Sequence, residues 1–268
     1  MLSSPRPRER WARKQSLRQE YEEFILQQIE EYKDRLTRRD LMAIADEAVR
    51  ELEPGSDEQL VLTEVLILEH VDRLIKRRLK LPTFRRWRDQ HVRLREEQRQ
   101  PGHWGLHRDT VLAELALRLD DTDTALLVGG GATAAGLFLA AHDWPALLID
   151  GSLTTVETAE RRAASEGLAT RFQALVVSLG GWFPDVTPSL VVLDPSTISA
   201  LEPAAQCQLI GTLKGLTKSG GVHHMPRVHH HHEVASLCDE IVRSHYGDWS
   251  LNRPGKSRRG HELLAVKP

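Results

Sequence analysis

Four short apolar runs in the second half of the chain constrain its fold more than any other feature of the sequence. The runs are Ala125–Val128, Ala146–Ile149, Phe172–Val177 and Leu190–Leu193. Helical patterns alternate with them, at Leu137–His142, Thr154–Glu166 and Pro203–Leu216. This alternation predicts an α/β domain whose parallel sheet carries helices on both faces, because strands buried on both faces are apolar throughout.

The first hundred residues show helical periodicity and almost no strand signal. One helix is predicted from Leu17 to Leu36, a second after Thr37, and a polar, arginine-rich one over Phe84–Gln98. Between them, Leu60 to Leu81 is apolar on more than one side, which places that helix at the centre of a small bundle. We therefore expect an all-helical domain over residues 1–102 and an α/β domain over residues 103–268.

Composition excludes several classes of protein. The chain has 268 residues, 40% of them hydrophobic, and its longest apolar run is too short for a membrane span of about 18 residues. The basic N-terminus lacks the apolar stretch of a secretory signal, and two cysteines are too few for a disulfide framework. These features predict a cytoplasmic protein that does not enter a membrane.

A glycine turn and an acidic residue point to a nucleotide-type ligand. Gly129, Gly130 and Gly131 follow the first apolar run and precede a helix, where bare backbone and a helix N-terminus can approach a ligand. Asp150 ends the next run, at the edge of the sheet where such ligands bind, and its carboxylate can accept hydrogen bonds from ribose hydroxyls. A tight turn without a ligand, beside a solvated Asp150, is the alternative.

The glycine turn fits two cofactor classes. Gly129, Gly131 and Ala134 satisfy the G-x-G-x-x-A pattern of dinucleotide enzymes. Further strand signals follow Lys218-Ser-Gly-Gly221, around Trp249–Leu251 and over His261–Val266, and the last two predict a closing hairpin. With this hairpin, residues 103–268 resemble the class I S-adenosylmethionine-dependent methyltransferases, a Rossmann-like family with a mostly parallel seven-stranded sheet.

The resemblance rests on Leu-Val-Gly-Gly-Gly-Ala-Thr at 127–133, Leu-Leu-Ile-Asp at 147–150, Leu-Val-Val-Leu-Asp-Pro at 190–195 and Lys-Ser-Gly-Gly-Val at 218–222. It implies S-adenosylmethionine as cofactor. The methionine part would lie on Gly129, Gly130 and Gly131, the ribose on Asp150, and the adenine beside Ser178 and Leu179. Three positions depart from the family pattern, because Leu127 and Ser178 replace frequent acids and Thr133 replaces a glycine.

Two features could supply chemistry beside the cofactor. Asp194, at the end of the fourth run, could orient or deprotonate an acceptor, or it could only cap the next turn. His223, His224 and His229–His232 follow the fifth strand signal, and we expect His223 near the acceptor as a base. A metal site and a solvated polar loop are alternatives for this stretch, and methyl transfer requires no metal.

The strongest charge feature lies at the end of the helical region. Arg73 to Arg99 holds 11 Lys and Arg against 3 Asp and Glu, although the whole chain has a net charge of −2. Phe84 and Trp87 are interleaved with the arginines, a pattern that suits phosphate contacts with some base stacking. The alternative is a solvated face that pairs with the acidic run Glu20 to Asp34, or that binds a protein.

Two functions remain open from the sequence. The first is S-adenosylmethionine-dependent methyl transfer to an unidentified acceptor. The second is a catalytically silent scaffold of the same fold, which binds nucleic acid or protein through its basic helical region. A nicotinamide oxidoreductase ranks third, because of the predicted hairpin and the lack of a Tyr-x-x-x-Lys pair.

Overall fold

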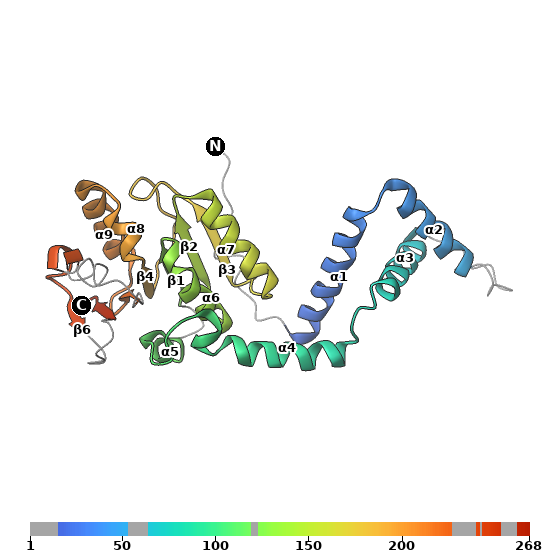
Figure 1. Ribbon diagram of the computed structural model, residues 1–268, viewed down its shortest axis with the longest axis horizontal. Coiled ribbons are helices and arrows are strands. Elements are labelled where there is room, and N and C mark those ends of the chain that lie inside the picture. Colours follow the sequence, from blue (N-terminus) through green and yellow to red (C-terminus); the bar gives the residue numbers. More distant parts are fainter. Residues whose placement is uncertain (1–15, 53–63, 119–122, 227–239, 242, 253–261) are drawn as a thin grey trace. The chain divides into compact units, whose positions relative to one another are not determined.

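The computed structural model describes residues 16–52, 64–118, 123–226, 240–241, 243–252 and 262–268 (Figure 1). The chain divides into two compact units, one ending at Leu94 and the other beginning at Arg95. This division falls inside the helix α4 (Phe84–Gln98), eight residues before the domain boundary expected at residue 102. The end of that helix belongs to the second unit because the buried Gln98 donates to the Glu166 carbonyl at 2.8 Å, and the Trp104 indole donates to the Gln98 carbonyl at 2.6 Å.

The second unit contains a seven-stranded sheet in the order β3-β2-β1-β4-β5-β7-β6. Its strands are β1 (Ala125–Val128), β2 (Ala146–Asp150), β3 (Phe172–Val176), β4 (Leu190–Leu193), β5 (Val222–Met225), β6 (Ser250–Asn252) and β7 (Leu263–Val266). The pairs among β1 to β5 are parallel, and β7 is antiparallel to both of its neighbours. The predicted sheet and its closing hairpin are confirmed.

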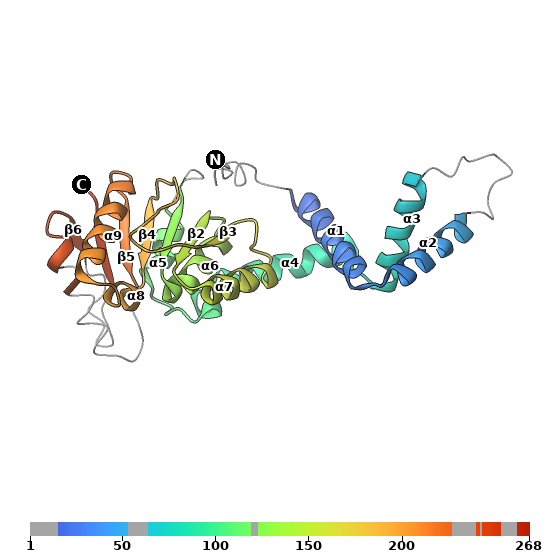
Figure 2. The same cartoon turned by 90° about the horizontal axis from the view of Figure 1, so that it is seen from above.

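Helices cover both faces of this sheet, as predicted (Figures 1 and 2). They are α5 (Val111–Ala116), α6 (Thr133–Ala141), α7 (Leu153–Ser165), α8 (Pro195–Ser199) and α9 (Pro203–Leu216). One core cluster joins α5, α6 and α7 to alternate strand residues such as Leu127 and Val192, and a second joins α8 and α9 to Leu126 and Val191. The alternation follows from the two-residue period of a strand, which sends neighbouring side chains to opposite faces.

Gly136 lets α6 pack closely against the sheet. A Cβ atom at this position would lie 2.7 Å from Leu127 Cδ1 and 2.9 Å from Phe172 Cε2. Both contacts are with buried side chains of the core, which have little room to move. Gly136 therefore serves packing.

The first unit consists of α1 (Leu17–Arg35), α2 (Arg38–Leu52), α3 (Glu64–Arg78) and most of α4 (Phe84–Gln98). Ser16 starts α1 with a capping box, in which Ser16 Oγ accepts from the Gln19 N–H and Gln19 Oε1 accepts from the Ser16 N–H. The shared core contains residues from every helix: Tyr21, Ile25, Ile29, Ile44, Ala48, Val71, Leu74, Ile75 and Trp87.

The position expected for α3 is only partly correct. Val71, Leu74 and Ile75 are buried, but Val65 and Leu68 are more than half exposed, at 62% and 54%. The preceding segment, which includes Leu60 and Leu62, lies outside the described residues. Among the described residues, the apolar side chains near the start of α3 therefore face solvent rather than the centre of a bundle.

A pair of glycine substitutions tests the packing of α6. Gly136→Ala should lower the free energy of unfolding by about 1–3 kcal/mol, because the added methyl group overpacks the core. Gly211→Ala, in α9 where nothing lies within 4 Å of the added Cβ, should raise it by about 0.5–1 kcal/mol. Urea unfolding of both variants measures these two changes in the free energy of unfolding. A Gly136→Ala variant as stable as the wild-type protein would contradict the close contact.

Candidate functional site

The glycine turn joins β1 to α6 at the carboxyl edge of the sheet. Gly129 has a φ of +89°, a left-handed backbone that favours glycine, and its N–H donates to the Ile149 carbonyl at 3.0 Å. A short 3₁₀ helix, η4 (Gly130–Ala132), then leads into α6. The predicted strand, turn and helix are therefore present in that order.

Side chains that follow β4 lie directly against this turn. A Cβ at Gly129 would be 2.3 Å from Thr197 Oγ1, and one at Gly131 would be 2.7 Å from Asp194 Cγ. Contacts this short exclude any side chain at these two positions. The need for glycine at 129 and 131 is thus explained by Thr197 and Asp194, without a ligand.

Both carboxylate oxygens of Asp194 accept hydrogen bonds from other residues of the chain. It is the N-cap of α8, and Oδ1 accepts from the Ser196 N–H at 3.1 Å. Oδ2 accepts from Thr197 Oγ1 at 2.8 Å and from the Gly131 N–H at 3.2 Å. The capping alternative is therefore what the geometry supports, and Asp194 fixes the glycine turn relative to β4.

Asp150 has a free oxygen that faces the same turn. The residue ends β2 and is 8% exposed, and its Oδ1 accepts from the Ser152 N–H at 2.7 Å. Its Oδ2 has no hydrogen-bond partner among the described residues and lies 3.6 Å from the position of a Cβ on Gly130. A carboxylate with one oxygen anchored and one available suits a ligand that donates hydroxyl hydrogen bonds.

Ser178 and Leu179 follow β3 at the same edge, one strand beyond Asp150. The Val177 N–H donates to the Asp150 carbonyl at 2.9 Å, which fixes this segment beside β2. Ser178 is exposed, and Leu179 is half-buried against the core cluster of α8 and α9. The order of strands thus brings Ser178, Asp150, Gly129 and Asp194 to consecutive positions along one edge.

The role expected for His223 is corrected by its position. The side chain has no exposed surface, its Nε2 is 2.8 Å from Thr217 Oγ1, and its Nδ1 is 2.7 Å from the Tyr246 hydroxyl. Burial, with smaller contributions from Lys214 and Lys267, lowers the pKa of His223 to about 3. A neutral ring with both nitrogens occupied cannot reach an acceptor, so His223 is part of the core between the sheet, Tyr246 and Trp249.

His224 lies on the opposite face and meets an acid that the sequence motifs do not mark. It is fully buried, and its Nε2 lies 3.9 Å from Glu262 Oε2. Burial acts to raise the pKa of Glu262, but His224, the Val111 N–H and Thr110 outweigh it, and the pKa is lowered. Glu262 Oε2 accepts from the Val111 N–H at 2.8 Å and so holds the start of α5 against β7.

The remaining histidines of the stretch, His229–His232, lie outside the described residues. In the part of the chain that the structure describes, no three His, Cys, Asp or Glu side chains are grouped to hold a metal ion. Within the same ranges, none of the helices combines the length and apolar character needed to cross a bilayer.

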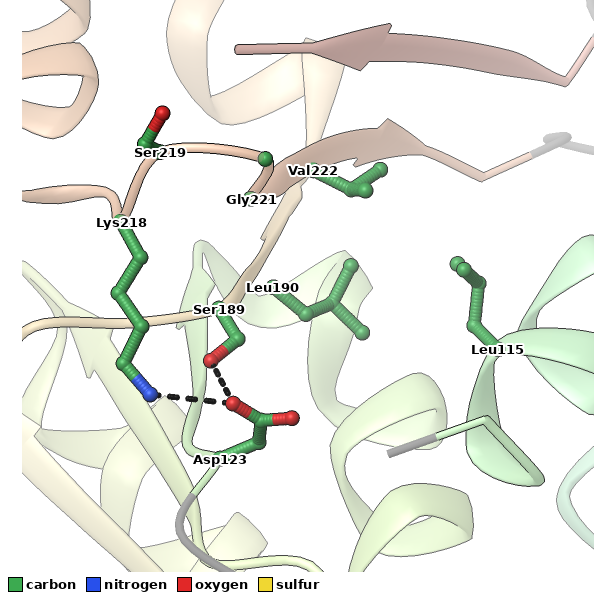
Figure 3. Close-up of a pocket in the computed structure, with 9 residues that line it drawn as sticks. Leu115, Asp123, Ser189, Leu190, Lys218, Ser219, Gly221 and Val222 are labelled. Atoms are coloured by element: carbon green, nitrogen blue, oxygen red, sulfur yellow. Dashed lines mark hydrogen bonds and ion pairs between the residues drawn. The ribbon is translucent and has the colours of Figure 1, made fainter. Parts of the chain in front are cut away.

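A separate hollow of about 200 Å³ lies at the amino edge of the sheet (Figure 3). Its polar side is formed by Asp123, whose Oδ1 lies 3.0 Å from Lys218 Nζ and accepts a short hydrogen bond from Ser189 Oγ. Leu115, Leu190 and Val222 form the apolar side. These contacts join the starts of β1, β4 and β5, and none of the residues expected to bind a cofactor lies there.

The strand order, with β7 antiparallel between β5 and β6, defines a class I methyltransferase fold. Solved structures similar to this chain include the glycopeptide N-methyltransferase MtfA with bound S-adenosylmethionine, an O-methyltransferase from Thermotoga maritima and the N-methyltransferase NodS from Bradyrhizobium japonicum. Their identities are 14%, 14% and 15%, and their TM-scores are 0.45, 0.43 and 0.40.

The similarity covers 59%, 60% and 58% of this chain, and 86%, 66% and 93% of those three chains, in the same order. No family model and no curated protein matches the sequence.

The buried imidazole of His223 makes stability depend on pH. In the unfolded chain a histidine titrates near 6.5, whereas the folded state keeps His223 neutral down to about 3. As the pH falls below about 6.5 the unfolded state binds the extra proton, so stability should fall by up to about 1.4 kcal/mol per pH unit.

Urea unfolding between pH 7 and pH 4 measures this slope. His223→Gln, which does not titrate at this position, should reduce the slope. An equal slope in the wild-type protein and in His223→Gln would show that His223 is protonated in the folded state.

Proposed function

We propose that the second unit binds S-adenosylmethionine at the carboxyl edge of its sheet and transfers the methyl group to an unidentified acceptor. The observation that carries the proposal is the carboxylate of Asp150. One of its oxygens is anchored on Ser152, and the other, which has no hydrogen-bond partner among the described residues, lies beside Gly130 and the Thr155 side chain. Such a carboxylate at the end of the second strand suits the two hydroxyls of a ribose.

Each part of the edge would hold a different part of the cofactor. Asp150 would accept from the ribose, the glycine turn would lie beside the methionine part, and Ser178 and Leu179 would flank the adenine. The cofactor supplies an electrophilic methyl group on a sulfonium, and its transfer is an in-line displacement. The protein must hold the acceptor in line with the methyl group and exclude water from the site.

Asp194 is assigned a positioning role in this proposal. Its carboxylate fixes Gly131 and the start of α8, so it shapes the turn on which the cofactor would lie. Asp194 is therefore not assigned as the base that deprotonates the acceptor, nor is His223, which is enclosed in the core.

One observation favours the second candidate function, a silent scaffold of the same fold. Asp194 and Thr197 occupy the space against Gly129 and Gly131, and the N–H of Gly131 already donates to Asp194. A turn whose donor is used internally offers fewer contacts to a ligand, and each lost hydrogen bond costs about 0.5–1.5 kcal/mol.

Calorimetric titration with S-adenosylhomocysteine separates the two functions. Asp150→Asn keeps an oxygen for the Ser152 N–H and removes the charge, so it should weaken binding about ten- to a hundredfold, corresponding to about 1.5–3 kcal/mol for a hydrogen bond to a charged group. The wild-type protein should give a clear binding heat.

Glu160→Gln is the matched control, because it removes one negative charge from an exposed position on α7. It should bind as the wild-type protein does. The absence of binding heat with the folded wild-type protein would contradict the enzyme and favour the scaffold, and equal binding by Asp150→Asn would remove the ribose role of Asp150.

A further inference from the structure

The solvent-exposed face of α4 carries arginines that have no acidic partner among the described residues. Three basic residues elsewhere in the Arg73 to Arg99 block have acidic partners: Arg77 lies 2.6 Å from Glu51, Arg78 pairs closely with Glu47, and Arg99 lies 3.1 Å from Asp143. Arg85, Arg86 and Arg93 are exposed, and no salt bridge to a described residue is formed by any of them. Three positive charges without an acidic partner among the described residues therefore lie within nine residues of α4.

These three arginines surround a shallow hollow of about 330 Å³, which Thr83, Asp89 and Gln90 complete. Asp89 already accepts from Arg88 at 2.9 Å, so its charge is compensated. Every side chain that lines the hollow is polar or charged. A protein interface has an apolar and aromatic core, whereas a surface of guanidinium, hydroxyl and amide groups suits phosphate oxygens.

The arginines extend over a length of helix comparable to several phosphates of one strand. Arg86 and Arg93 are seven residues apart, which is about 10 Å along an α-helix. Phosphates of one strand of a double helix advance about 3.4 Å per base pair, so two turns of α4 extend over about three of them.

The aromatic residues of α4 do not take part in this surface. Trp87 is 8% exposed and stacks on the His91 ring with centroids 4.4 Å apart, and Phe84 packs against Trp87 and Tyr21. Base stacking, on which single-strand binding depends, is therefore not available from Phe84 or Trp87. The stacking component expected from the sequence is wrong, and only phosphate contacts remain.

We propose that Arg85, Arg86 and Arg93 form a docking surface for the phosphate backbone of a double-stranded nucleic acid, bound without base readout. The proposal concerns the helical unit alone and does not depend on methyl transfer. It predicts binding that weakens steeply with salt, because each neutralised phosphate releases a counterion.

The test uses the full-length chain and a fluorescein-labelled duplex DNA of random sequence, with fluorescence anisotropy read at several salt concentrations. The triple variant R85E/R86E/R93E should bind at least about tenfold more weakly. Removing three phosphate contacts should also make the slope of log K against log salt shallower by about 2.7. If R85E/R86E/R93E does not fold, R85Q/R86Q/R93Q is measured instead, because it removes the three positive charges without adding negative ones.

R108E/R161E/R243E is the matched control, because it makes the same change of charge at exposed positions of the second unit. It should retain most of the binding. An equal loss in both triple variants would overturn the proposal, because net charge would then explain the binding.

Two other outcomes would also overturn it. One is the absence of binding to the duplex, and the other is equally tight binding of polyglutamate, which would mark a surface for any polyanion. A duplex RNA of the same sequence is measured in parallel, and binding of either duplex that is lost in R85E/R86E/R93E alone supports the surface.

Discussion

The contact between Asp194 and the glycine turn determines the arrangement of the whole carboxyl edge. One carboxylate caps α8, binds the Thr197 hydroxyl and accepts from the Gly131 N–H, so it joins the end of β4 to the turn after β1. β1 and β4 are neighbours at the centre of the sheet, so this contact fixes the position of the glycine turn. Asp150 faces that turn from the end of β2, the strand on the other side of β1. Any ligand at this edge must fit a turn already shaped by the protein's own acid.

The sheet could be predicted from the sequence, whereas the use of its polar residues could not. Apolar runs such as Leu190–Leu193 identify buried parallel strands by composition alone, and the hairpin of β6 and β7 followed from its two strand signals. The motif around Asp194 is compatible with both a base and an N-cap, and only the positions of Ser196, Thr197 and Gly131 distinguish them. Such distances depend on tertiary packing, which a one-dimensional pattern does not contain.

His223 and His224 show how strand geometry divides adjacent residues of the same type. They are neighbours in β5, so their side chains point to opposite faces of the sheet. The His223 ring lies on the face covered by α9, beside Tyr246, and the His224 ring lies on the face covered by α5, beside Glu262. In the linear sequence the two residues belong to one histidine-rich stretch with His229–His232. Glu262 carries no motif, and only the pairing of β5 with β7 brings it near His224.

Residues that are neighbours in the sequence also lie on different faces of α4, one packed in the core and one charged and exposed. Trp87 and Phe84 enter the core of the helical unit, while Arg85, Arg86 and Arg93 remain on the exposed side. In the linear sequence these residues are interleaved, so they suggest a single surface that combines stacking with phosphate contacts. The helix separates them, because a period of 3.6 residues sends alternate groups to opposite sides. The arginine face of α4 is thus available for contacts while the aromatic face stabilises the fold, and a substitution on one face need not disturb the other.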